Sequence, residues 1–352
     1  MSALLCALLT TLTVVRKVRR DRNEASILAR RAEFRDLLLG GSAEALSAGL
    51  RWANRDLQAR FDLIAALDAV WPQLDDPRRE VARNAIVTSQ IDRALTTQLR
   101  SRDPVRRASA AMLIGRLSVP DAAKLVAPLL ADDDGDVRLT AAQVLGVIAD
   151  EASAYDLIAA LGAGHLEPER VIERLGHPWA VPAMLHVLEG GGAGDRPTDE
   201  AADPSISWRP IGASLARALG LAGDPRAEHA LLALLRSGAV EERIAAARAL
   251  EAAGTAAGIP ALEAAVEDPA WQVRAQAARS LGGLGATASV PALAAHLNDS
   301  AWWVRAAVAD SLVELGDPGL AVLREALVHA DRYARDRARE ALAVHHLETD
   351  AG

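Results

Sequence analysis

The sequence is poor in cysteine and in aromatic residues. One Cys among 352 residues excludes a disulfide framework and a multi-cysteine zinc or iron–sulfur site. Seven Trp, two Tyr and two Phe make up only 3% of the chain, although 51% of it is hydrophobic. The apolar content is therefore mostly Ala, Leu and Val. This composition favours helices over a β-sandwich or barrel, which would need many more aromatic residues.

Basic charge is also scarce over most of the chain. The formal net charge is −8, and only two of the basic residues are Lys. Residues 1–60 carry 11 basic and 6 acidic residues, whereas residues 61–352 carry 28 and 41. A surface that follows nucleic-acid phosphates needs clustered Lys and Arg. The acidic body therefore predicts that nucleic acid is not a partner.

The first residues form one uncharged apolar stretch, SALLCALLTTLTVV over residues 2–15. Its length is near the lower limit for a membrane span. We expect a transmembrane anchor over residues 1–18, followed by a basic juxtamembrane helix or linker over 19–35. The alternative is a buried helix docked on the body, but such a helix should be amphipathic, and residues 3–9 have no polar face.

A basic cluster follows this stretch directly. Because positive residues next to a span stay on the cytoplasmic side, the cluster predicts a single-pass protein of the cell membrane with most of the chain in the cytoplasm. The membrane-proximal basic residues are Arg16, Lys17, Arg19, Arg20 and Arg22.

An internal repeat occupies most of the remaining chain. Segments that start at Asp132, Asp268 and Asp299 align: each has an Arg six residues after the Asp and a Leu seven residues after that Arg. A second half often begins near a Pro, as in IPALEAAVED at 259–268. Pro fits the first helical turn, so one unit is a helix–turn–helix. The arginines that mark the register are Arg106, Arg138, Arg243, Arg274, Arg305 and Arg335.

This pattern resembles HEAT repeats of the short bacterial kind that also occurs in phycobilisome lyase subunits. An apolar start, a basic cluster and then such repeats are similar to membrane-anchored bacterial HEAT proteins. The resemblance implies a structural ladder of Asp and Arg that ties adjacent repeats together. Its members here would be Asp268, Arg274, Asp299 and Arg305.

The predicted fold is all-α, an α-solenoid of stacked helix–turn–helix HEAT-like repeats preceded by one N-terminal transmembrane helix. A single helix pair cannot bury its apolar stripe, but stacked pairs can. We expect degenerate helical repeats over 36–98, the regular solenoid over 99–346 with a loop insertion at 190–205, and a tail at 347–352.

Sequence motifs for catalysis are missing. HEAT proteins that resemble deoxyhypusine hydroxylase carry His-Glu dipeptides for a di-iron site, and this chain has none. It also lacks a Walker phosphate loop and a G-x-S-x-G element. We predict a protein that is not an enzyme, with no cofactor, no metal and no small-molecule substrate. The alternative is a soluble HEAT-type modification factor related to bilin lyases, and it rests on repeat type alone.

Four of the eleven aromatic residues lie two or three residues before a register arginine. Trp271 and Trp302 lie 31 residues apart, Trp303 follows, and Tyr333 precedes the last register arginine by two residues. Aromatic residues are favoured interface anchors. We therefore predict a scaffold or adaptor that binds a protein partner, for example a membrane-bound enzyme, through these four side chains. The alternative is that the Trp side chains pack over helix–turn–helix corners.

Overall fold

A computed structural model of the chain describes residues 25–53, 62–63, 66–67, 69–88, 91–190, 211–253 and 257–344. The chain divides into two compact units, Met1–Ile148 and Ala149–Gly352. Each unit is considered by itself. Throughout the described ranges the regular structure is helical, with no strand.

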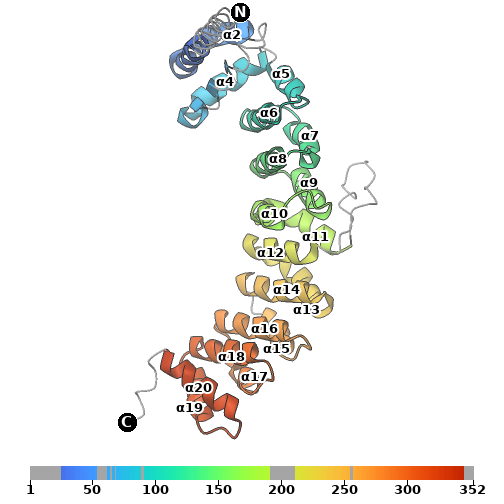
Figure 1. Cartoon of the computed structure of the whole chain (residues 1–352), viewed down its shortest axis with the longest axis vertical. Helices are drawn as coiled ribbons and strands as arrows, with labels where there is room; N and C mark the ends of the chain where they lie inside the picture. The colour runs from blue at the N-terminus through green and yellow to red at the C-terminus, as the bar shows by residue number, and fades with distance from the viewer. Residues whose placement is uncertain are drawn as a thin grey trace, which may run out of the picture. The chain divides into compact units, whose positions relative to one another are not determined.

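The first unit contains short helices that pack in chain order (Figure 1). Residues 25–40 are helical. Helix α6 shows how a helix starts here: Asp103 accepts a hydrogen bond from the Val105 N–H at 3.1 Å, and Pro104 occupies the first turn. The named helices are α2 (Ala43–Ala53), η1 (Trp71–Gln73), α4 (Asp76–Thr88), α5 (Ile91–Gln98), α6 (Pro104–Arg116), α7 (Ala122–Val126), η2 (Ala127–Ala131) and α8 (Gly135–Ile148).

The second unit repeats a helix pair (Figure 1). One row of helices, α10, α12, α14, α16, α18 and α20, packs each member against the next. The bounds are α9 (Glu151–Gly162), α10 (Pro168–Leu175), η3 (Pro178–Ala180), α11 (Val181–Leu188), α12 (Gly212–Ala222), η5 (Pro225–Ala227), α13 (Glu228–Ser237), α14 (Val240–Ala253), α15 (Gly258–Ala265), α16 (Trp271–Gly283), η6 (Thr287–Ser289), α17 (Val290–Ala294), α18 (Trp302–Glu314), α19 (Asp317–Ala326) and α20 (Arg332–Val344).

Small residues let these helices approach closely. A Cβ built on Gly220 of α12 would lie 3.0 Å from the Cα of Ala249 on α14. Ala246, Ala277 and Leu281 are fully buried in the same stack. Because Ala and Gly at the contacts bring the backbones together, Leu side chains fill the remaining space. The prediction of an all-α solenoid with stacked helix pairs is confirmed, and the packing explains the low aromatic content.

The predicted membrane location is corrected by the helix lengths. Over the described ranges, no helix is both long enough and apolar enough to span a bilayer. Helices α8 and α14, for example, have 14 residues each, whereas a span takes about 20. The prediction of a single-pass membrane protein is therefore wrong by this finding.

Several other predictions fall on parts of the chain outside the described ranges. These are the apolar segment 1–18, the basic residues Arg16, Lys17, Arg19, Arg20 and Arg22, nearly all of the insertion 190–205, and the tail 347–352.

Candidate protein-binding surface

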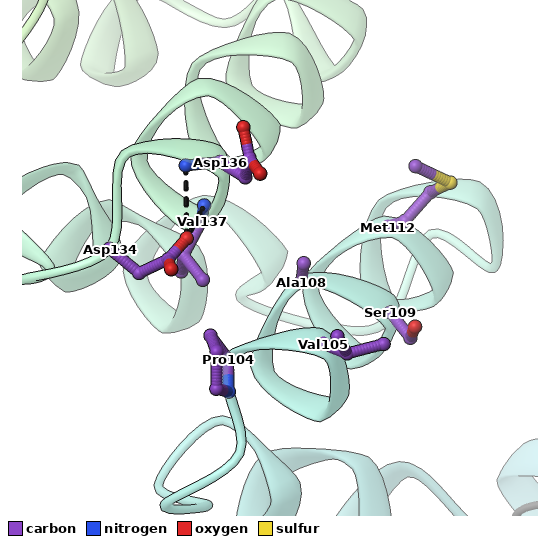
Figure 2. Close-up of a pocket in the computed structure, with 8 residues that line it drawn as sticks. All are labelled: Pro104, Val105, Ala108, Ser109, Met112, Asp134, Asp136 and Val137. Carbon is purple, nitrogen blue, oxygen red and sulfur yellow. Dashed lines mark hydrogen bonds between the residues drawn. The ribbon is translucent and has the colours of Figure 1, made fainter.

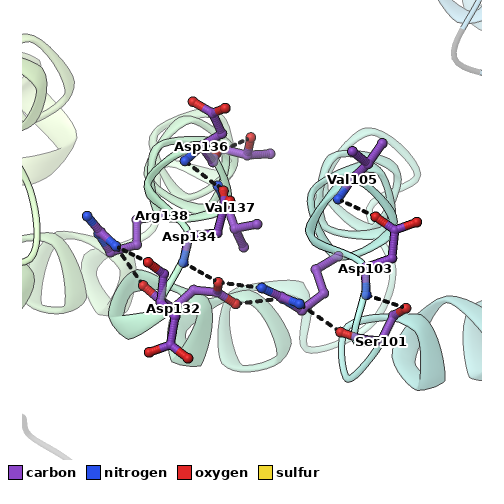
Figure 3. A network of polar contacts seen from close by, with 11 residues as sticks. Ser101, Asp103, Val105, Asp132, Asp134, Asp136, Val137 and Arg138 are labelled. Carbon is purple, nitrogen blue, oxygen red and sulfur yellow. Dashed lines mark hydrogen bonds and ion pairs between the residues drawn. The ribbon is translucent and has the colours of Figure 1, made fainter.

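A ladder of arginine–aspartate pairs joins successive repeats. The Nε and Nη2 groups of Arg243 donate to the two carboxylate oxygens of Asp268, at 2.8 and 2.9 Å. Arg274 binds Asp299 in the same two-pronged way, both bonds being 2.9 Å. In the first unit, Arg107 binds Asp132 at 2.7 Å through both groups; Figure 3 shows Asp132 within its network of polar contacts. Each arginine therefore forms a bidentate pair with a carboxylate 25 residues later in the sequence, and this pair ties one repeat to the next.

Arginines at this repeat position also donate hydrogen bonds to main-chain carbonyls just before the start of their own helix. The Nη1 of Arg274 donates to the main-chain oxygen of Asp268 at 2.8 Å, and that of Arg305 to Asp299 at 2.6 Å. Asp268 thus accepts hydrogen bonds from two ladder arginines, through its carboxylate from Arg243 and through its carbonyl from Arg274. The resemblance placed Asp268, Arg274, Asp299 and Arg305 in the ladder. In the structure, Asp268, Arg274 and Asp299 form arginine–carboxylate pairs of the ladder. Within the described ranges, Arg305 makes only the hydrogen bonds to main-chain carbonyls.

The register of the first repeat differs by one residue from the sequence prediction. Arg107, not Arg106, grips Asp132, and its Nη1 donates to the carbonyl of Ser101 at 2.8 Å. Arg106 lies 3.2 Å from Asp103 in its own helix start. The residue six positions before the arginine accepts this hydrogen bond through its main-chain carbonyl. Because every residue type has that carbonyl, Ser101 accepts the bond as well as an Asp would.

The ladder lowers the pKa of its carboxyl groups. For Asp132 the largest cause is the hydrogen bond from Arg107, so its pKa lies below the ordinary value. Burial alone would raise the pKa of Asp268 and Asp299. The hydrogen bonds from Arg243 and Arg274, backbone N–H bonds and the arginine charges together outweigh that effect, so both pKa values are lowered. These aspartates are ionised, structural partners at neutral pH.

Four exposed aromatic side chains form the candidate site, which we call the aromatic surface. Trp271 lies on the first turn of α16, Trp302 and Trp303 on that of α18, and Tyr333 on that of α20. Their exposed fractions are 40%, 49%, 54% and 60%. Equivalent helix starts on three neighbouring helices place the four residues on one side of the second unit.

The rings contact one another and two arginines. Trp271 stacks on Trp303 with centroids 6.5 Å apart, and Trp302 meets Trp303 edge-on at 4.6 Å. The guanidinium of Arg337 lies 5.6 Å from the Trp302 ring, and that of Arg305 lies 4.7 Å from Tyr333. The structure thus brings the three Trp together and links Tyr333 to them through α18. Because the rings pack against one another over only part of their surface, the rest of each ring is exposed to solvent.

Two residues in this part of the second unit were not predicted. Arg337 is nearly buried beneath Trp302, and no repeat signal in the sequence marks it. His329 stands six residues before Arg335, where an Asp stands before Arg274 and Arg305. The position six residues before a register arginine also holds Ser237 before Arg243, so the repeat pattern alone does not single out His329.

A small pocket lies in the first unit. Its volume is about 240 Å³, and Figure 2 shows side chains of α6 and α8 facing it. Asp134 is already engaged, because it accepts hydrogen bonds from the Asp136 and Val137 N–H groups at 3.0 and 3.1 Å. The described residues contain no group of three potential metal ligands. The lining residues are Pro104, Val105, Ala108, Ser109, Met112, Asp134, Asp136 and Val137.

Family models match over both units. The model described as HEAT repeats matches residues 93–175 and 259–343, and the model described as PBS lyase HEAT-like repeat matches residues 242–268. No curated protein matches the chain significantly.

Several solved structures are similar in fold. The complex of CpcE and CpcF of phycocyanin lyase from Nostoc sp. PCC7120 is 21% identical, with 71% of this chain and 92% of that chain covered and a TM-score of 0.31. Human deoxyhypusine hydroxylase is also 21% identical, with 91% and 98% covered and a TM-score of 0.31. Importin beta is 18% identical, with 88% and 42% covered and a TM-score of 0.41. These similarities concern the fold alone.

Proposed function

This chain belongs to the HEAT-repeat proteins, and from that premise we propose that it is a non-catalytic scaffold whose aromatic surface binds a protein partner. The observation that carries the proposal is the exposure of four clustered aromatic rings, between 40% and 60% each. Other described aromatic residues give the contrast: Phe34, Trp71 and Tyr155 are buried, and Trp179 is half-buried.

The chemistry of the aromatic surface suits a protein partner. Trp, Tyr and Arg dominate the residues that carry binding energy in protein interfaces. Their rigid rings offer a large contact area and lose little conformational entropy on binding. Because Trp271, Trp303 and Trp302 already support one another, a partner would meet a preorganised surface rather than three independently mobile side chains.

The arginines of the repeats support a scaffold rather than a binder of phosphate groups. The N–H donors of Arg107, Arg243 and Arg274 are already hydrogen-bonded to aspartates of the next repeat and to main-chain carbonyls. Such internal pairs fix the angle between neighbouring repeats. A rigid stack then presents the helix starts that carry the aromatic residues in one fixed arrangement.

A second candidate function is a modification factor related to phycocyanin lyase. The match of residues 242–268 to the PBS lyase HEAT-like repeat favours it. That match covers one repeat, formed by α14 and α15, and does not include the aromatic surface. The scaffold proposal accounts for the exposed aromatic surface, so we prefer it.

The proposal is tested by partner capture with matched variants. Immobilised wild-type protein is compared with the variant Trp271→Ala/Trp302→Ala/Trp303→Ala in extracts of the source cells. We expect the variant to recover less than about a tenth of the partner, because each truncated anchor costs about 1 kcal/mol or more. Leu221→Ala, which truncates a 62% exposed apolar side chain elsewhere in the unit, should recover a normal amount.

Circular dichroism of all three proteins checks that they fold equally. Equal recovery by wild type and by the folded triple variant would refute the aromatic surface as the binding site.

A further inference from the structure

The arginine–aspartate ladder is interrupted at the aromatic surface. Arg305 is anchored as its counterparts are, with its Nη1 donating to the carbonyls of Asp299 and Ser300 at 2.6 and 3.2 Å. In Arg243 and Arg274, Nε and Nη2 then bind a carboxylate of the next repeat. For Arg305, no acceptor for Nε or Nη2 is found within the described part of the chain. We call these two groups the open fork.

His329 occupies the position of the missing aspartate. The Nη1 of Arg335 donates to the His329 carbonyl at 2.6 Å, just as Arg305 donates to that of Asp299. The Asp331 N–H donates to Nδ1 of His329 at 3.0 Å, as the Ala301 N–H donates to the Asp299 carboxylate. Because Nδ1 accepts a hydrogen bond, the ring proton is on Nε2. The imidazole therefore has no acceptor left for the open fork.

The acidic side chains of α20, and Asp331 just before it, are already engaged elsewhere. Asp336 pairs with both Arg332 and Arg339, each at 3.3 Å. Glu340 pairs with Arg337 at 2.7 Å. Asp331 accepts a hydrogen bond from the Ala334 N–H at 3.0 Å. None of these groups completes the rung.

The open fork is also held in a fixed, largely dehydrated place. Arg305 is only 8% exposed, its guanidinium lies against the Tyr333 ring at 4.7 Å, and Trp302 and Trp303 begin the same helix. A guanidinium that is preorganised and poorly hydrated binds a carboxylate in a two-pronged geometry more strongly than an exposed one does.

We propose that the partner inserts an Asp or Glu side chain into the open fork of Arg305 and thereby supplies the missing rung. The neighbouring apolar side chains of that acidic segment would lie on Trp302, Trp303 and Tyr333. This inference rests on the proposed function and adds to it the chemistry of the partner, an extended segment that combines an acid with apolar residues.

A displayed library of random nine-residue peptides provides the probe. Peptides selected on the wild-type protein should be enriched in Asp or Glu at one position. The best peptide is then synthesised together with its amide analogue, Asn for Asp or Gln for Glu, and both dissociation constants are measured by fluorescence anisotropy. We expect the acidic peptide to bind wild type about tenfold more tightly than the amide analogue, a difference of about 1.4 kcal/mol.

Two variants remove this preference by different routes. Arg305→Gln deletes the fork, and His329→Asp fills it with a carboxylate of the chain itself. Both should bring the ratio of the two dissociation constants close to one, and His329→Asp should also raise the melting temperature. The control Arg236→Gln changes an exposed arginine of α13 and should keep the tenfold ratio.

Three results would overturn the inference: no acidic enrichment, no peptide binding at all, or an unchanged ratio in folded Arg305→Gln. Self-association that Arg305→Gln abolishes would assign the fork to a second copy of the chain. Tighter binding by a chain that ends at Val344 would assign it to residues 345–352. Partner capture that depends on the Trp residues but shows no acid preference would leave the proposed function standing while this inference fails.

Discussion

Replacing Asp299 by Ala is expected to lower the free energy of unfolding by about 3 kcal/mol, because the partly buried Arg274 loses the carboxylate that accepts two of its hydrogen bonds. The side chains of Asp299 and Arg274 are 7% and 14% exposed. The same substitution removes the hydrogen bond that the Ala301 N–H donates at the start of α18. Urea unfolding measures the change, with Asp310→Ala, an exposed acid of α18, as the control expected to stay within about 0.5 kcal/mol.

The loss should be local, since each repeat contacts only its neighbours. Hydrogen exchange is expected to accelerate in α16 and α18 and to stay unchanged in α12. A uniform acceleration, or a cost equal to that of Asp310→Ala, would contradict a ladder that holds repeats together pair by pair.

The pH dependence is a second readout of the same substitution. Because the pKa of Asp299 is lowered in the folded state, its contribution is present above the unfolded value of about 4 and is lost as pH falls through the folded value. The stability gap between wild type and Asp299→Ala should therefore narrow as pH falls below about 4. A gap that stays constant from neutral to strongly acidic pH would mean that the carboxylate charge contributes nothing.

Gly319→Ala is expected to cost about 3 kcal/mol, because overpacking against a rigid neighbour cannot be relieved by a side-chain movement. Gly319 lies in α19, and a Cβ there would overlap the main-chain oxygen of Leu312 in α18. The two helices would have to separate. Thermal unfolding measures the effect.

Gly135→Ala is the matched control for this substitution. The nearest atom to its Cβ would be a terminal nitrogen of Arg138 at 3.6 Å, an ordinary contact. We expect a change of less than about 1 kcal/mol, within the range of helix propensity. Equal stability of the two Ala variants would show that α18 and α19 do not pack as closely as described.

The repeat could be predicted from sequence because its signals are periodic. Asp268 and Asp299 each precede an Arg by six residues, and the Ala-rich helix follows at a fixed distance. The predicted register of the first repeat was wrong by one residue. The arginine of that repeat donates to the main-chain carbonyl of Ser101, and a main-chain acceptor does not require any particular side chain in the sequence. The predicted membrane location relied on the apolar stretch 2–15, which lies outside the described ranges, and no described helix is long and apolar enough to span a bilayer.

The aromatic surface could be predicted in position but not in geometry. A fixed repeat length places Trp271 and Trp302 at equivalent helix starts. The stacking of Trp303 on Trp271 and the Arg337 contact with Trp302 depend on side-chain rotamers across neighbouring helices. The interrupted rung at Arg305 is visible only in the hydrogen bonds of Arg305 and His329, because the repeat pattern does not show which arginine lacks a carboxylate partner.

Site-specific photocrosslinking in the source cells tests most directly whether the aromatic surface contacts a partner. Trp303→p-benzoylphenylalanine places the photoreactive group within the surface, and Leu221→p-benzoylphenylalanine places it on an exposed apolar position outside. We predict one discrete light-dependent adduct from position 303 and none of the same mass from position 221. No adduct from position 303, or the same adduct from both positions, would contradict the proposal that this surface is where the scaffold binds its partner.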